Sequence, residues 1–257
     1  MEWLVQDFSL HNHSSLSDGF DSILDIAQFA ENIGLKTVGI SDHFYRIENR
    51  LQEYIEIIHN AQDKVKIKIL IGAEVDVPDE KEISALEHIK KQYGFDFFIG
   101  AVHGIREKNL YVGDQNEITQ SLEFHKKYWQ LVTQLASGMF DIIAHIDIVK
   151  ISGVNYEQIV NEYIERALEL FKNTNQIIEV NTKDPMNVCP SDYILSKIIE
   201  KKIPLILSSD SHSKSNLCSN FDREYNRILT KFDNAKIIDK STDIIQYLQT
   251  RKLKEQP

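Results

Sequence analysis

The sequence predicts a parallel α/β barrel made by a single domain over residues 1–257, in preference to a doubly wound sheet. Three observations support this fold. Seven short apolar segments of strand character alternate with segments of helical periodicity, and no linker rich in Gly, Pro or Ser separates them. A titratable side chain also stands at, or a few residues beyond, the end of nearly every predicted strand. In a barrel all strands end on one rim, so these side chains would meet there.

The first half of the chain contains four predicted strands that end in such residues. A short alternating run leads to His11 and His13, and side chains two residues apart on a strand point to the same side. The later segments are, in order, a helix from Asp21 to Gly34, a strand from Lys36 to Ile40 that leads to His43, a helix from Glu48 to about Lys66, a strand that carries Glu74, a helix from Glu82 to Tyr93 and a strand that leads to His103.

The second half continues this alternation and adds two polar loops, residues 105–115 and 183–190, the first of which we expect to lie over the site. The other segments are a helix from Ile118 to Ala136, a strand with His145 near its end, a helix from Tyr156 to Phe171, a strand ending at Asn181, a helix from Asp192 to Lys201 and a strand that leads to Asp210 and His212. The tail predicts a helix from Asn216, a short strand over 235–239, a helix from Thr242 to Leu248 and a frayed end over 252–257.

Composition restricts the partners and the compartment. The chain has 39 acidic and 29 basic residues, and its net charge of −10 argues against duplex nucleic acid and an anionic membrane surface as partners. We therefore expect a small substrate, and we leave a homodimer open. The N-terminus has no export signal and no apolar run is long enough to span a bilayer, which predicts a cytoplasmic protein. Cys189 and Cys218 have no metal-site or redox spacing and are expected to be reduced thiols.

The residues at the strand ends have the chemistry of a catalytic metal site. Imidazoles and carboxylates suit Zn²⁺, Mn²⁺ or Fe, and a ligand set without cysteine favours a catalytic site over a structural one. Two or three divalent ions would lower the pKa of a bridging water and bind phosphate oxygens, which predicts phosphoester hydrolysis. The candidate ligands are His11, His13, Asp18, His43, Glu74, His103, His145, Asp210 and His212. The remaining histidines, His59, His88 and His125, fall in helix patterns and are given no role.

Seven short motifs, in order along the chain, resemble those of the PHP family, the polymerase and histidinol phosphatase domain. They are His11-x-His13, Ser17-Asp18-Gly19, Ser41-Asp42-His43, Gly72-x-Glu74-x-Asp76, Val102-His103, His145-x-Asp147 and Ser209-Asp210-x-His212. The resemblance implies a distorted TIM-like (β/α)7 barrel with three metal ions. It implies that one ion is bound by His11, His13, Glu74 and Asp210, a second by Glu74, His103 and His145, and a third by Asp18, His43 and His212.

Within the family, the chain length and the segments FHKKYWQLV, SGMFDIIAHIDIVK and IIEVNT are similar to the histidinol-phosphate phosphatase branch. This implies hydrolysis of L-histidinol phosphate to L-histidinol and phosphate, by attack of a hydroxide that bridges the ions. The expected catalytic residues are His43, Glu74, Asp210 and His212.

The chain departs from that branch in the loop that follows the IIEVNT segment. The branch usually has a loop with Gly and Arg there, whereas this chain reads KDPMNVC over 183–189. Phosphate binding would then fall to Lys183, which lacks the bidentate fork of Arg, or to Arg106. Asn181 would contact substrate or position a ligand, and Asp42 and Asp147 would orient ligands or cap turns.

Other functions remain open at this stage. The same site could serve a phosphoesterase that acts on a nucleotide, a sugar phosphate or a phosphotyrosine protein. A nuclease is disfavoured by the acidic composition and by the lack of a basic or aromatic stripe. An amidohydrolase would be expected to carry a bridging Lys on the fourth strand, where this chain has His103. A catalytically silent module that binds metal only for stability is the alternative of another class.

Overall fold

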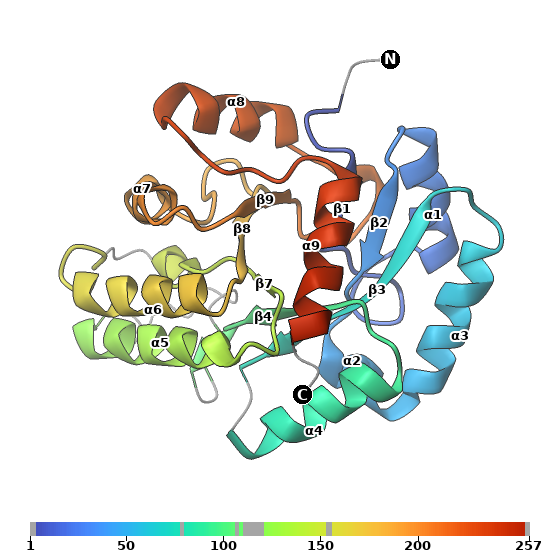
Figure 1. The fold of residues 1–257 in the computed structure, drawn as a ribbon, viewed down its shortest axis with the longest axis horizontal. Helices are drawn as coiled ribbons and strands as arrows, with labels where there is room; N and C mark the ends of the chain where they lie inside the picture. Colours follow the sequence, from blue (N-terminus) through green and yellow to red (C-terminus); the bar gives the residue numbers. More distant parts are fainter. Residues whose placement is uncertain (1–3, 78–79, 106–107, 110–120, 153–155, 255–257) are drawn as a thin grey trace.

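Seven parallel strands form one sheet in the order β1-β2-β3-β4-β7-β8-β9, seen as the ring of arrows in Figure 1. The computed structural model describes residues 4–77, 80–105, 108–109, 121–152 and 156–254. The strands are β1 (Phe8–Ser9), β2 (Thr37–Ile40), β3 (Lys68–Asp76), β4 (Phe97–Ala101), β7 (Ile142–Ile143), β8 (Ile177–Asn181) and β9 (Leu205–Ser208). A separate antiparallel pair is formed by β5 (Gly104–Ile105) and β6 (Lys108–Asn109).

The ring closes between its first and last strands just beyond their carboxyl ends. Asn12 and Ser211 form a parallel bridge there. The backbone N–H of His13 donates to the Ser211 carbonyl at 2.8 Å, and the N–H of Ser211 donates to the His11 carbonyl at 3.1 Å. The structure is therefore a nearly closed α/β barrel, as predicted, and the closing bonds join the two strand ends that carry the most candidate ligands.

Within β9 the backbone of Leu207 pairs with a side chain instead of with the backbone of β1. The amide of Gln6 is buried, donates to the Leu207 carbonyl at 2.9 Å and accepts from the Leu207 N–H at 2.9 Å. At the amino end of β9 the predicted short strand over 235–239 is reduced to a single bridge between Leu205 and Ile237. The N–H of Asp7 donates to the Asp239 carbonyl, so this segment connects β9 to the start of β1.

Helices cover the outside of the ring, and a last helix blocks its amino-terminal end. The outer helices are α1 (Ile23–Asn32), α2 (Phe44–Ile47), α3 (Leu51–Gln62), α4 (Glu80–Gln92), α5 (Leu122–Gln134), α6 (Asn161–Asn173), α7 (Asp192–Glu200) and α8 (Phe221–Lys231). The barrel interior is apolar, with Phe8, Phe97 and Ile206 in one buried cluster with Ile244 and Leu248 of α9 (Ser241–Lys254; red in Figure 1). Burial of these side chains supplies the main driving force that holds α9 in place.

Several predicted helix limits were wrong. The helix expected over residues 48–66 consists of a 3-10 turn over Glu48–Arg50 and of α3, which ends at Gln62, and the short helix α2 precedes it. The helix expected from Tyr156 begins at Asn161. The C-terminal helix is longer than predicted, because Arg251 is 4% exposed and donates to Asp141 and to backbone carbonyls at the base of the barrel. No helix within the described ranges has the length and apolar character needed to cross a bilayer.

Candidate metal centre

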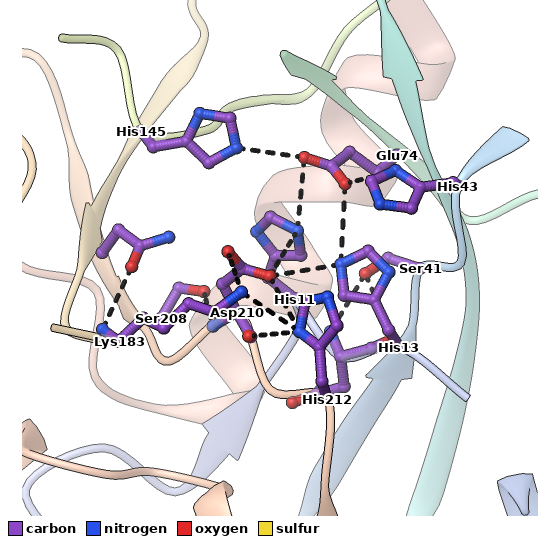
Figure 2. A network of polar contacts seen from close by, with 12 residues as sticks. His11, His13, Ser41, His43, Glu74, His145, Lys183, Ser208, Asp210 and His212 are labelled. Atoms are coloured by element: carbon purple, nitrogen blue, oxygen red, sulfur yellow. Dashed lines mark hydrogen bonds and ion pairs between the residues drawn. The ribbon is translucent and has the colours of Figure 1, made fainter. Parts of the chain in front are cut away.

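All nine predicted ligands lie together at the carboxyl ends of the strands. Figure 2 shows His11, His13, His43, Glu74, His145, Asp210 and His212 among them. The side chains come from six places in the sheet. His11, His13 and Asp18 follow β1, His43 follows β2, Glu74 lies within β3, His103 follows β4, His145 follows β7, and Asp210 and His212 follow β9. The topology thus gathers residues that are up to 201 positions apart (His11 to His212) into one site.

Glu74 lies at the centre of the cluster and is 2% exposed. Its two carboxylate oxygens face different imidazoles. Oε1 lies 3.4 Å from Nε2 of His11, 3.2 Å from Nε2 of His103 and 3.2 Å from Nε2 of His145. Oε2 lies 3.5 Å from Nε2 of His13 and 3.0 Å from Nδ1 of His43. A carboxylate whose oxygens face two separate sets of imidazoles has the arrangement needed to bridge two ions.

Two further carboxylates complete the cluster. Oδ1 of Asp210 lies 3.3 Å from Nε2 of His13 and 3.5 Å from Nδ1 of His212. Oδ2 of Asp18 lies 3.3 Å from Nε2 of His43 and 3.3 Å from Nε2 of His212. Within the described residues, three groups have potential ligand atoms within 4.8 Å of one another: His13 with Asp18, His43 and His212; His11 with His13 and Asp210; and His43 with Glu74 and His103.

The donor set fits divalent cations. Nε2 of His11 and both ring nitrogens of His13 are buried and make no hydrogen bond within the described part of the chain. Buried imidazole nitrogens normally have a hydrogen-bond partner or a metal. The mixture of imidazoles and carboxylates with no cysteine suits Zn²⁺, Mn²⁺ or Fe. The cluster can therefore hold divalent ions, and the close grouping of its ligand atoms provides for more than one.

Comparison with known proteins agrees with this geometry. The PHP domain model matches residues 9–183, more than half of the chain. The chain belongs to the PHP domain family. It is 25% identical over 215 residues to the DNA polymerase/3′-5′ exonuclease PolX of Bacillus subtilis (strain 168). That match covers 79% of this chain and 34% of PolX, so the chain spans about a third of the length of this relative.

A solved structure supports the fold of this PHP domain. It is that of histidinol phosphate phosphatase from Lactococcus lactis subsp. lactis Il1403, in complex with zinc, L-histidinol and phosphate. The two structures superpose with a TM-score of 0.69 over 91% of this chain and 95% of the other, at 20% sequence identity. The likeness confirms the TIM-like barrel of the PHP fold.

Two carboxylates that the sequence analysis gave no role hold imidazoles of the PHP site in place. Oε2 of Glu179 lies 2.6 Å from Nδ1 of His11, and Oδ1 of Asp76 lies 2.6 Å from Nδ1 of His103. Such partners fix the ring orientation and the tautomer, and leave Nε2 to face the site. The signal for Glu179 in the sequence is an acidic residue inside an otherwise apolar strand, since IIEVN is buried throughout.

Asp42 and Asn181 also act on neighbours of the site. Asp42 is buried and accepts hydrogen bonds from the backbone N–H of Ser14 at 2.6 Å and from its hydroxyl at 2.7 Å, which fixes the chain directly after His13. The amide of Asn181 is 7% exposed and donates to Oε1 of Glu179 at 2.8 Å. In this structure Asn181 thus positions Glu179, and its contact with substrate stays a prediction.

The loop over 183–190 begins at the site and is held at its far end. Nζ of Lys183 lies 3.1 Å from Oδ2 of Asp210, and its side chain is 42% exposed. At the other end, Lys150 donates to the Val188 carbonyl, and Asp147 accepts from the Ser191 N–H at 2.7 Å. Asp147 therefore holds this loop and the start of α7. Of the two roles expected for it, orienting a ligand or capping a turn, this contact corresponds to the second. Arg106, the other expected phosphate contact, lies outside the described residues.

The backbone is constrained at three points of the site. His145 and Asp210 have φ values of 25° and 44°, in the left-handed region that non-glycine residues seldom adopt. Such conformations persist where the surrounding structure enforces them, and they are concentrated at functional sites. Gly19 is required by space, because a Cβ on it would lie 2.2 Å from the His13 carbonyl oxygen. The tight approach positions the loop that carries Asp18.

Charge is distributed unevenly over the imidazoles. Burial opposes ionisation of Glu74, but the imidazoles of His103 and His11 outweigh it and hold the pKa of the carboxyl well below its usual range. Burial would also lower the pKa of His43, yet its contacts with Asp18 and Glu74 raise that pKa to about 9. For His13 burial dominates and lowers the pKa to about 4, so this imidazole is neutral and able to coordinate a cation.

The cluster opens into a pocket of about 350 Å³. Its lining combines four carboxylates with three imidazoles, and it consists of Asp18, His43, Tyr45, Glu74, Asp76, His103, Lys183, Asp210 and His212. Lys183 is the one Lys or Arg in this lining among the described residues. Pockets of this size bind small metabolites.

Proposed function

We propose that this PHP domain is a metal-dependent phosphomonoesterase of a small metabolite, with L-histidinol phosphate as the leading substrate. The observation that carries the proposal is the position of Glu74, whose two oxygens face five imidazoles at the floor of a small pocket that Lys183 lines. The structural likeness to a phosphatase that binds L-histidinol and phosphate makes this substrate the first to test.

The residues divide into those that would hold ions and those that would hold substrate. The nine clustered side chains would bind two or three divalent ions, with Glu74 shared between two of them. Ions bound there would supply a water of lowered pKa and positive charge for the phosphate oxygens. His43, Glu74, Asp210 and His212 are the proposed catalytic residues. Each offers a ligand atom and lines the pocket, as Asp18 and His103 also do.

Lys183 would bind the phosphate group as a point charge. Its Nζ lies 3.1 Å from Asp210 and 3.2 Å from Nδ1 of His212, so it reaches the ligand cluster. Hydrogen bonds between charged groups are worth about 1.5–3 kcal/mol. We expect Lys183→Ala to raise KM about 10- to 100-fold. The matched control is Lys214→Ala, since Lys214 pairs with the surface residues Asp21 and Asp25.

The test is phosphate release by protein reconstituted with Zn²⁺ or Mn²⁺. L-histidinol phosphate would be compared with sugar phosphates, nucleotides, a phosphotyrosine peptide and a short single-stranded oligonucleotide. The proposal predicts metal-dependent release with a preference for L-histidinol phosphate. Preference for another ester would keep the phosphoesterase and replace the substrate, and preference for the oligonucleotide would favour an activity like that named for PolX. No release from any ester by protein shown to hold metal would favour a silent metal-binding module.

A further inference from the structure

An aromatic side chain stands exposed at the mouth of the PHP pocket. Tyr45 lies on the short helix α2, two residues after His43, and it lines the pocket while remaining 52% exposed. It is the one aromatic residue other than histidine in that lining among the described residues. The metal centre gives Tyr45 no role, since its ring contributes no ligand to the cluster.

Tyr45 is part of a wider apolar arc on the rim. The large apolar side chains that are exposed in the described residues are Phe20, Tyr45, Ile159, Met186 and Leu229. Three of the five, Phe20, Tyr45 and Met186, follow β1, β2 and β8, and these strands lie in one continuous part of the ring, because β9 joins β8 to β1. Of the three, Tyr45 is the one that lines the pocket within the described residues.

The exposed residues of this arc are carried by a fixed backbone. The N–H of Phe20, whose side chain is 84% exposed, donates to the carbonyl of the candidate ligand His212 at 2.8 Å. The N–H of Met186 donates to Asp184 at 2.8 Å. The ring of Tyr45 lies 5.3 Å from that of His43, with 30° between the planes, and the Arg46 guanidinium lies 5.1 Å from the Tyr45 centroid. These contacts fix the backbone at Phe20 and Met186 and place the Tyr45 ring beside His43 at the pocket.

The two sides of the pocket therefore differ in chemistry. Lys183 contacts Asp210 and His212 on the β9 side, whereas Tyr45 lies against His43 on the β2 side. Figure 2 shows Lys183 and His43 at opposite sides of the cluster. A phosphate bound near Lys183 and the metal ligands would leave the rest of a small substrate to extend over the cluster toward Tyr45. A planar group offers the best contact with an aromatic ring.

We propose that Tyr45 determines substrate specificity by stacking on the leaving group, and that the substrates are phosphomonoesters whose alcohol carries an aromatic or heteroaromatic ring. This inference rests on the proposed function and narrows its substrate class. It assigns to Tyr45 a binding role with no part in bond cleavage. Loss of the ring should therefore raise KM for ring-bearing esters and leave kcat nearly unchanged.

The first test measures binding without turnover. Phenylphosphonate and propylphosphonate share one anionic head and have a P–C bond that a phosphatase does not cleave. Calorimetry on zinc-reconstituted protein should show about tenfold tighter binding of the phenyl compound. Tyr45→Phe should keep this ratio and Tyr45→Ala should abolish it. The control Leu229→Ala alters an exposed residue of α8 that is not part of the pocket lining and should keep the ratio. Equal binding of the two phosphonates to the wild type would overturn the inference.

A second test measures turnover and separates the two proposals. Tyr45→Ala should raise KM about tenfold for a ring-bearing ester such as L-histidinol phosphate and leave KM for a linear alkyl phosphate within twofold. An equal change for both esters would contradict the role of Tyr45. Should no ester be hydrolysed while phenylphosphonate retains its Tyr45-dependent advantage, the stacking site would stand and the proposed phosphatase activity would fall.

Discussion

Substitution of Glu179 by Gln tests how the second layer of side chains controls the metal centre. Oε1 of Glu179 accepts two hydrogen bonds, from the His145 N–H at 3.2 Å and from the Asn181 amide at 2.8 Å, while Oε2 lies 2.6 Å from Nδ1 of His11. In Glu179→Gln the amide oxygen must occupy the Oε1 position in order to keep both donors paired. The new NH₂ group then faces Nδ1 of His11.

This orientation changes the tautomer of His11. An NH₂ group donates to Nδ1, so the ring proton moves to Nε2, the nitrogen that faces Glu74 and Asp210. A protonated Nε2 cannot coordinate a cation. The loss of such a partner lowers metal affinity about 10- to 100-fold, or about 1.4 to 2.7 kcal/mol, and we expect the upper end because the ligand nitrogen itself is blocked.

Zinc affinity would be measured by competition with a chromophoric chelator. The matched control is Glu165→Gln, which removes a carboxylate that pairs with Lys197 and Lys201 at the surface. Ion pairs of that kind contribute about 0–1 kcal/mol to stability, and the control should bind zinc like the wild type. Zinc affinity of Glu179→Gln within twofold of the wild type would refute the tautomer argument.

Three other perturbations give distinct results. Gly19→Ala places a Cβ against the His13 carbonyl and should weaken zinc binding at least tenfold, because it displaces the loop of Asp18. The control Gly94→Ala, at φ 72°, should lower stability by about 1 kcal/mol and leave zinc binding unchanged. Equal zinc affinities of the two variants would contradict the packing argument. Arg251→Met should lower the urea unfolding free energy by about 3–5 kcal/mol because it leaves Asp141 buried with fewer partners, against about 0–1 kcal/mol for the more exposed Lys252→Met, and similar losses would contradict this account. His125 is 2% exposed, and burial lowers its pKa to about 4. Between pH 6.5 and 4 this imidazole is therefore protonated in the unfolded chain and neutral in the folded chain, so the free energy of unfolding should fall by up to about 1.4 kcal/mol per pH unit as the pH falls. His125→Phe should remove that part of the pH dependence, as measured by urea unfolding at each pH.

The fold was largely predictable because its signal is local. Each strand is a short apolar run, and the polar ligands begin where the run ends, as in Thr37–Ile40 followed by His43. The limits of helices were less predictable, since tertiary contacts decide them. The segment TRKLK has the composition of a frayed tail, yet Arg251 is buried because the base of the barrel presents Asp141 and several carbonyls to it. No pattern within the segment itself indicates those partners.

The candidate ligands were predictable for the same reason, whereas their supporting groups were not. A histidine or carboxylate at a strand end is conspicuous, but Glu179 lies inside the apolar strand β8 and becomes recognisable only when it meets His11 across the barrel. The role of Asn181 was left open because a strand-end amide can face the pocket or a neighbour. The fold turns it toward Glu179.

The most direct test of the central claim is the metal content of the folded protein. Protein loaded with zinc and freed of excess metal would be measured by inductively coupled plasma mass spectrometry, together with Glu74→Gln. We expect two or three zinc ions per wild-type chain and the loss of at least one ion in the variant, since Glu74 faces both halves of the cluster. Fewer than one ion per chain in the wild type, or an unchanged content in Glu74→Gln, would contradict it.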